Sequence, residues 1–207
     1  MKIIAVADTH TVVNDFGTLS SGDVFVHAGD FCNLGSLMDA KYFNDMLGKM
    51  KCQHKIVVAG NHDRALEDNI GIENELLSNA VYLRDKTITI EGIKFYGSPW
   101  QLPFNNWAFN KPEKELKKIF DLIPKDTDVL ITHSPPYGIM DFVRGRHLGS
   151  VSLRKRIEQI KPRCCIFGHI HEGYGKYVDS KTGITYINAS LIGGEFKEIH
   201  KPFEIII

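Results

Sequence analysis

The sequence is poor in cysteine and has no long apolar run. Its four cysteines, Cys32, Cys52, Cys164 and Cys165, are too few and too irregularly spaced for a disulfide framework. They form no C-x-x-C pair, which argues against a closed zinc–thiolate site. No apolar run approaches the roughly 20 residues that cross a bilayer, and the chain enters a strand-like segment at Lys2 without the charged region of a signal peptide. We therefore expect a cytoplasmic protein with reduced thiols and no membrane partner.

Net charge is also absent, because 25 basic residues balance 25 acidic ones. No overall field would draw the protein to nucleic acid or to an anionic membrane, so we do not expect nucleic acid as a partner. A chain of 207 residues can bury a full hydrophobic core, and we expect residues 1–207 to form a single domain. Nothing in the sequence predicts the oligomeric state.

Five short apolar segments each end in residues that bind metals, and they read KIIAVADTH, DVFVHAGD, KIVVAGNHD, DVLITHSPP and CCIFGHIH. Their β-branched residues favour strands, and open α/β sheets bind ligands beyond the carboxyl ends of strands. The five ends deliver Asp8, His10, Asp30, Asn61, His62, Asp63, His133, His169 and His171. Carboxylates and imidazoles without thiolates suit Mn, Fe or Zn in an open site. We interpret this pattern as a two-metal hydrolytic centre.

In order and spacing, these segments resemble the calcineurin-like metallophosphoesterase superfamily. The resemblance is carried by Asp8-Thr9-His10, Gly29-Asp30, Gly60-Asn61-His62-Asp63, His133 and Gly168-His169-Ile170-His171, which span nearly the whole chain. A lone D-x-H or G-D occurs by chance in most proteins, whereas five ordered matches after strands are specific. The nearest resemblance is to the metallophosphoesterase-domain-containing protein branch. Some vertebrate members of that branch lack the histidine that stands here at position 169 and are weak enzymes. This chain keeps His169, so we expect a competent site.

The resemblance implies two divalent metal ions, with manganese expected and iron, zinc, nickel, cobalt or magnesium as alternatives. It assigns one ion to Asp8, His10, Asp30 and His171, and the other to Asp30, Asn61, His133 and His169, so that Asp30 bridges them. A water between two such ions ionises near neutral pH, and the hydroxide would attack phosphorus in line. His62 would protonate the departing alkoxide, and Asp63 would orient the His62 ring.

The periodicity of the chain predicts an α/β fold. Strand-like segments at about 2–7, 23–27, 55–59, 128–132 and 164–167 alternate with helical patterns at 36–50, 112–123 and 152–160. Ser36 with Asp39 resembles a capping box. Two hairpins are expected, over 87–96 and 174–187, and 203–207 forms a last strand. Helices that alternate with strands early, and hairpins late, predict two packed sheets with helices outside. The resemblance implies a four-layer α/β/β/α sandwich of two mixed sheets flanked by helices.

Substrate contacts are suggested by aromatic and cationic residues near the motifs. Trp100 and Trp107 lie in one segment, and stacking a base on such a ring is worth roughly 1 to 3 kcal/mol. The alternative is that these rings pack the segment onto the body of the protein or form a dimer contact. Arg64 follows Asp63 and is a candidate to grip a substrate phosphate.

The function expected is a metal-dependent phosphoesterase that acts on a small phosphoester such as a nucleotide. A phosphodiesterase is favoured, with cyclic nucleotides as candidate substrates, because the resembling branch is linked to their hydrolysis. One alternative is a small-molecule phosphomonoesterase, since the same centre handles both esters, and another is a non-catalytic nucleotide sensor or scaffold. The residues after Asp30 read Phe31-Cys32-Asn33-Leu34-Gly35. They lack the arginine of the G-D-x-x-D-R-G motif, which argues against a protein-serine/threonine phosphatase.

Overall fold

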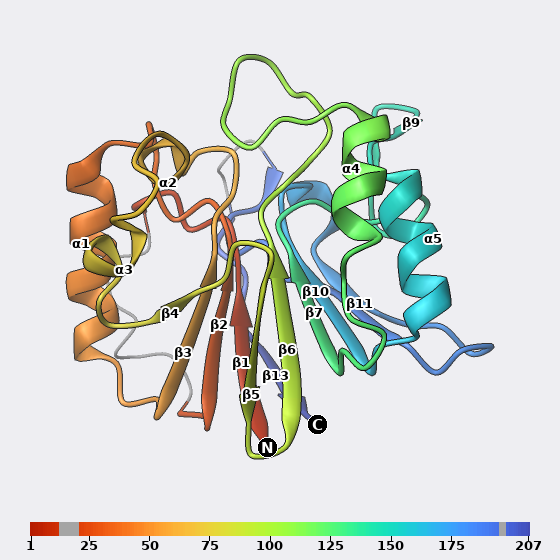
Figure 1. The fold of residues 1–207 in the computed structure, drawn as a ribbon, viewed down its shortest axis with the longest axis horizontal. Helices are drawn as coiled ribbons and strands as arrows, with labels where there is room; N and C mark the ends of the chain where they lie inside the picture. The colour runs from red at the N-terminus through yellow and green to blue at the C-terminus, as the bar shows by residue number, and fades with distance from the viewer. Residues whose placement is uncertain (13–20, 195–197) are drawn as a thin grey trace.

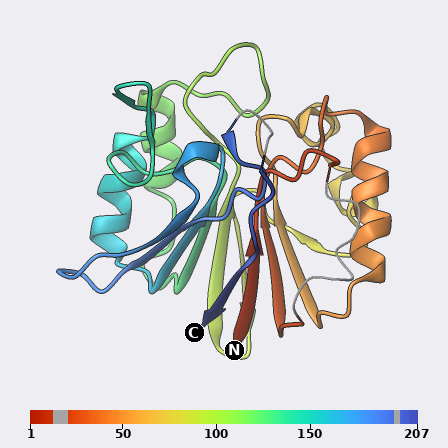
Figure 2. The ribbon, with the colours of Figure 1, turned by 180° about the vertical axis from the view of Figure 1, so that it is seen from behind.

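The computed structural model describes residues 1–12, 21–194 and 198–207. Two β-sheets pack face to face, and helices cover the outer face of each, as Figure 1 and, from behind, Figure 2 show. This arrangement confirms the expected four-layer α/β/β/α sandwich. Among the described residues, the first sheet has the strand order β13-β1-β2-β3-β4, and the second has the order β11-β12-β10-β7-β6-β5. The strands β8 (Phe142–Val143) and β9 (Arg146–His147) form a small separate ribbon.

The first sheet is parallel except at one edge. Its strands are β1 (Lys2–Val6), β2 (Val24–Ala28), β3 (His54–Val58), β4 (Val81–Tyr82) and the antiparallel β13 (Phe203–Ile206). In the second sheet the parallel strands are β6 (Ile93–Ser98), β7 (Val129–Thr132), β10 (Cys164–Phe167) and β12 (Thr185–Asn188). Antiparallel β5 (Lys86–Ile90) and β11 (Gly175–Val178) form its two edges. Both sheets are therefore mixed, as expected.

The helices divide between the two sheets. The first sheet is covered by α1 (Leu37–Lys49), α2 (Arg64–Asp68) and α3 (Glu73–Leu76), and the second by α4 (Glu113–Phe120) and α5 (Val151–Ile160). The Ser36 hydroxyl caps α1 by accepting a hydrogen bond from the Asp39 amide. The Asp39 carboxylate instead accepts from the Leu34 amide at 3.4 Å, so the expected capping box is formed on one side only.

The hydrophobic core has three parts, because both faces of the central strands are buried. Side chains alternate along a strand, so on β1 Ile3 and Ala5 belong to the cluster between the two sheets, whereas Ile4 and Val6 belong to the cluster beneath α1. A third cluster lies beneath α4 and α5 and includes Leu153. Parallel strands covered on both faces are apolar throughout, which explains the unbroken apolar runs that precede the ligand motifs.

Within the described ranges, no helix has the length and apolar character needed to span a bilayer. The cytoplasmic location and the assignment of all 207 residues to one domain stay predictions. The short elements α2, α3, β4, β8 (Phe142–Val143) and β9 (Arg146–His147) were not predicted.

Candidate metal centre

The carboxyl ends of parallel strands from both sheets meet at one end of the sandwich, the upper end in Figure 1. Loops after β1, β2 and β3 carry Asp8, Asp30 and Asn61, and loops after β7 and β10 carry His133 and His169. Backbone hydrogen bonds join these loops: the Asp8 amide donates to Gly29 O at 2.9 Å, and the Gly168 amide donates to His133 O at 2.9 Å. The sheets thus bring the predicted ligand positions together across more than 160 residues of sequence.

The predicted ligands form two donor groups whose atoms lie within coordination range of one another. Asp8, His10 and His171 form one, and Asp30, His133 and His169 form the other; within each, the donor atoms lie within 4.8 Å of one another. A third group, which overlaps both, joins His10 and Asp30 to His62 by the same criterion. In the first group, His171 Nε2 lies 3.5 Å from Asp8 Oδ1 and 3.4 Å from His10 Nε2. In the second, His133 Nε2 lies 3.3 Å from Asp30 Oδ2 and 3.1 Å from Asn61 Oδ1.

These separations fit metal ligation. Donors that bind one ion at about 2.0 to 2.2 Å lie roughly 3 to 3.5 Å apart in tetrahedral or octahedral geometry. Asp30 Oδ2 also lies 3.9 Å from His10 Nε2, so the Asp30 carboxylate stands between the two groups. Oxygen and imidazole donors without a cysteine match the set that Mn, Fe and Zn accept in open sites.

Electrostatics keep the two carboxylates ionised. Burial opposes ionisation of Asp8 and Asp30, yet the hydrogen bonds and charges of His171 and His133 outweigh it and hold both pKa values well below the usual range. Burial lowers the pKa of His133, but the Asp30 carboxylate outweighs that effect and raises it to about 9. Two buried carboxylates at one point need cations beside them, and protonated histidine or a metal ion can fill that need.

The ligand loops have an unusual backbone. Asp8, His10, Asp30 and His169 all have positive φ, between 44° and 68°, a conformation that costs non-glycine residues free energy and that clusters at functional sites. The Asp8 carboxylate helps to hold these turns, since Oδ2 accepts hydrogen bonds from the His169 amide at 2.9 Å and from the Ser190 hydroxyl at 2.7 Å. Ser190 was not singled out from the sequence.

The glycines before the ligands leave room for ligand side chains. A Cβ on Gly60 would lie 2.3 Å from Asp30 Oδ1, and one on Gly168 would lie 2.2 Å from Asp8 Oδ2. The space beside each glycine is occupied by the carboxylate of another ligand loop, so each glycine accommodates a residue from another motif.

His62 lies beside both donor groups. Its amide donates to Asp30 Oδ1 at 2.7 Å, and its Nδ1 lies 2.5 Å from the carbonyl oxygen of Asn33. The ring stacks on Trp107 and meets the edge of His10, with ring centroids 4.0 and 4.6 Å apart. These contacts fix the ring in the wall of the site.

Asp63 does not orient His62 in the way we expected. The Asp63 carboxylate is buried and accepts hydrogen bonds from the backbone amides of Asp30, Cys32 and Gly60, at 2.8, 2.8 and 2.7 Å. Burial and the Asp30 charge raise its pKa to about 7, against the effect of the amide donors. Because its oxygens are directed at these amides, Asp63 joins the loops after β2 and β3, and the Asn33 carbonyl takes the position beside the His62 ring.

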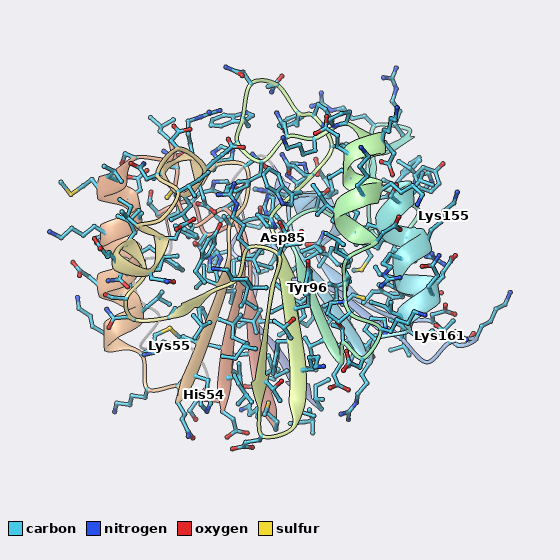
Figure 3. All side chains as sticks on the ribbon, viewed as in Figure 1. His54, Lys55, Asp85, Tyr96, Lys155 and Lys161 are labelled. Carbon is cyan, nitrogen blue, oxygen red and sulfur yellow. The ribbon has the colours of Figure 1, made fainter. Side chains whose placement is uncertain are left out.

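Arg64 and Trp100, the two other expected substrate contacts, point elsewhere. Arg64 Nη2 donates to Asn106 O at 2.5 Å, and Nη1 lies 4.0 Å from carboxylate oxygens of Glu67 and Asp68. Trp100 Nε1 donates to Asp85 Oδ2 at 2.6 Å, Figure 3 shows Asp85 at the upper end of β5, and Trp100 does not line the pocket over the ligands. Both side chains therefore pack the 100–110 segment onto the body of the protein. For Trp100, this packing role was the alternative to a contact with substrate.

A pocket of about 260 Å³ opens over the donor groups. It is lined by His10, Asp30, Asn61, His62, Phe104, His169, His171, Glu172 and Gly194. Phe104 and Glu172 were not predicted. Phe104 lies 5.7 Å from His169 between ring centroids, edge to face, and is 48% exposed. Two features of the sequence could have indicated these residues. Phe104 lies in the same segment as the tryptophans, and Glu172 directly follows His171.

Comparisons with known proteins agree with this geometry. A family model described as calcineurin-like phosphoesterase matches residues 1–173. Human metallophosphoesterase domain-containing protein 1 is 36% identical over 231 residues, which cover 99% of this chain and 70% of the relative. A UPF0046 protein of Caenorhabditis elegans is 34% identical over 225 residues, which cover 98% of this chain and 79% of the relative.

Solved structures share the fold. One aligns with a TM-score of 0.68 at 16% identity, covering 93% of this chain and 90% of that chain. Another, GAP50, described as the anchor in the inner membrane complex of Plasmodium, aligns with a TM-score of 0.53 at 13% identity, covering 99% and 77%. The chain belongs to the calcineurin-like phosphoesterase family. Its donor groups are accordingly those of a metal-dependent phosphoester hydrolase.

Proposed function

We propose that this protein is a two-metal phosphodiesterase for small phosphoesters, with cyclic nucleotides as candidate substrates. The proposal rests on one observation, the convergence of two donor groups on a single pocket with Asp30 between them. Such an arrangement suits a pair of ions about 3.5 to 4 Å apart that share one carboxylate.

The residues divide between two proposed ion sites. Asp8, His10, Asp30 and His171 would hold one ion, and Asp30, Asn61, His133 and His169 the other. When bound, the ions would supply Lewis acidity toward the phosphoryl oxygens and an activated water as nucleophile. We propose manganese as the native metal, which oxygen and imidazole donors accept. The same donors also accept iron, zinc, nickel, cobalt and magnesium, and a metal-exchange series would separate these alternatives.

His62 is proposed as the general acid. Its Nδ1 faces the Asn33 carbonyl at 2.5 Å, so that nitrogen carries a hydrogen, and Nε2 is left to exchange a proton with the substrate. A carbonyl partner fixes the tautomer in this way without adding a negative charge. Protonation of the departing ester oxygen by Nε2 would lower the barrier most for leaving groups that are poor without it.

The ester substituent is proposed to lie against Phe104. This ring is half exposed at the pocket and stands edge-on to His169. An aromatic face beside a phosphate site stacks nucleobases without base selectivity. Phe104 thereby takes the role that we first expected of Trp100, and Trp107 acts through its contact with His62.

The first test is hydrolysis by a metal-stripped sample to which manganese is restored, with a bis-aryl phosphodiester and the matching aryl phosphomonoester side by side. We expect manganese-dependent turnover that favours the diester, and a cyclic-nucleotide panel would follow. Preference for the monoester would replace this proposal with a phosphomonoesterase. Absence of manganese-stimulated turnover on either ester, at the level of an Asp30→Asn control, would overturn catalysis and favour a sensor or scaffold.

A further inference from the structure

The described lining of the pocket over the donor groups contains acidic residues and histidines, but no lysine or arginine. Among the described residues that line it, Asp30 and Glu172 are acidic and none is lysine or arginine. Arg64, the cation expected there, contacts Asn106 O, Glu67 and Asp68 instead. Phosphate-binding sites that accept dianions commonly hold them with paired arginine donors, whereas the described lining of this pocket offers the Glu172 carboxylate and no arginine pair.

Glu172 is held at the wall of that pocket by its local structure. It is the second residue of the short 3-10 helix η1 (His171–Gly173), so its backbone directly follows the ligand His171. A methyl group on Gly194, which also lines the pocket, would lie 3.4 Å from Glu172 Cγ and 3.8 Å from Oε1. The side chain is exposed, and no ion pair to it is found within the described parts of the chain.

We propose that Glu172 determines specificity by disfavouring dianionic phosphomonoesters relative to monoanionic phosphodiesters. This inference rests on the proposed function and assigns the choice between its two ester classes to one residue. A phosphomonoester carries a charge of about −1.5 to −2 at pH 7, and a diester carries one negative charge. A carboxylate at the pocket wall repels both, but the additional charge of the monoester makes its penalty larger. For an exposed carboxylate in high dielectric the difference is roughly twofold to threefold in rate.

The test compares selectivity in Glu172→Gln with that of the wild type. For the manganese-loaded enzyme, kcat/KM is measured on a bis-aryl phosphodiester and on the matching monoester at low ionic strength. We expect the ratio of monoester to diester kcat/KM to rise by roughly twofold to threefold in the variant. The rise should shrink at about 0.5 M salt, because screening weakens the repulsion that the carboxylate exerts. Glu172→Asp should keep most of the wild-type selectivity.

Glu198→Gln is the matched control, because Glu198 lies on the neighbouring segment, is exposed and does not line the pocket. It removes the same charge and should leave the ratio unchanged. An unchanged ratio in Glu172→Gln would overturn the inference. An equal shift in Glu198→Gln would also overturn it, because the ratio would then depend on the overall charge of the protein and not on a residue of the pocket.

A binding measurement separates this inference from the proposed function. Inorganic phosphate at about pH 8 is a dianionic probe, and dimethyl phosphate is a monoanionic one. In a thermal-shift titration of the manganese-loaded protein, Glu172→Gln should tighten phosphate binding roughly twofold to threefold more than dimethyl phosphate binding. A wild type that hydrolyses neither ester but shows this pattern would overturn the proposed function and keep the charge selection. Equal changes for the two anions would overturn the charge selection alone.

Discussion

The imidazole of His62 stacks on the indole of Trp107, with ring centroids 4.0 Å apart and ring planes inclined by 28°. The edge of His10 meets the His62 ring at 4.6 Å. The segment that carries Trp107 is attached to the motif of His62, because the Ala108 amide donates to Asn61 O at 3.0 Å. Trp107 therefore positions the proposed general acid rather than presenting a free face to a base.

Trp107→Ala should lower kcat and leave KM nearly unchanged. An aromatic pair of this kind contributes about 0.5 to 1.5 kcal/mol beyond its buried area, which corresponds to a roughly 2- to 12-fold loss in rate. Steady-state kinetics on the diester measures the two constants. Trp100→Phe is the control, since Trp100 packs on Phe109 away from the pocket and should keep kcat. A raised KM at constant kcat would show instead that the indole contacts substrate.

His62→Ala should retain metal and lose turnover. His62 is proposed to deliver a proton, so the loss should reach about 10²- to 10⁴-fold for an alkyl leaving group. It should be much smaller for a nitrophenyl leaving group, which departs without protonation. Metal content by mass spectrometry and the rates on both diesters provide the measurement. Loss of metal from the variant would reassign His62 as a ligand, a role open to it by its position beside His10 and Asp30.

Asp63→Asn separates the two roles that have been considered for Asp63. Its carboxylate accepts three backbone amides, and an asparagine has one acceptor oxygen and brings an NH2 group toward those donors. We expect a loss of about 1 to 3 kcal/mol in the free energy of unfolding, together with weaker metal binding because the Asp30 loop is released. Chemical denaturation and metal titration measure both quantities. A variant of full stability and metal affinity that lost only kcat would restore the orienting role.

The convergence of the proposed ligands could be predicted from sequence, whereas the residues that support them could not. Strand periodicity places Asp8 and His133 at strand ends, and parallel strands bring such ends to one edge. The partners of Asp63 are backbone amides whose directions depend on the left-handed turn at Asp30. Ser190 reaches Asp8 across 182 positions of sequence, and no local pattern reports such a contact.

Local turn chemistry explains which parts of the fold were predictable. Glu91 and Gly92 have φ of 48° and 82°, the two positive values that a tight two-residue hairpin needs, and β5 and β6 pair as expected. By contrast, α2 and α3 span five and four residues, which is too short for a helical period to be visible. These short elements form because tertiary contacts hold them, as when the Ala65 amide donates to Gly35 O.

Gly168→Ala should abolish metal binding with a modest loss of fold. The added Cβ would lie 2.2 Å from Asp8 Oδ2 and 2.5 Å from the Ala7 Cβ, so the Asp8 carboxylate has to leave its position. Gly48→Ala is the matched control, because it lies inside α1 against the end of the Asn79 side chain, 3.0 Å away, and alanine favours helix there. Manganese titration of both variants checks this. Wild-type metal affinity in Gly168→Ala would contradict the tight packing of this motif against Asp8.

The pH dependence of stability should carry a contribution from His27. This residue is buried on β2, where Nδ1 accepts from the Gly29 amide at 3.2 Å and Nε2 lies 3.0 Å from Thr9 Oγ1. The first contact requires an unprotonated Nδ1, so the ring is neutral and Nε2–H donates to Thr9. Burial lowers the pKa of His27 from 6.5 to about 3.

Between pH 6.5 and 3 the unfolded chain therefore binds a proton at His27 that the folded protein does not, so this contribution is full above pH 6.5 and is lost as the pH falls. From pH 7 to about 4.5, the wild type should lose roughly 2 to 3 kcal/mol more in the free energy of unfolding than His27→Gln. Urea denaturation of the two metal-free proteins at both pH values gives the difference between their losses in the free energy of unfolding. Groups that titrate in both proteins contribute equally to the two losses and cancel. Equal losses would mean that His27 is protonated within the fold.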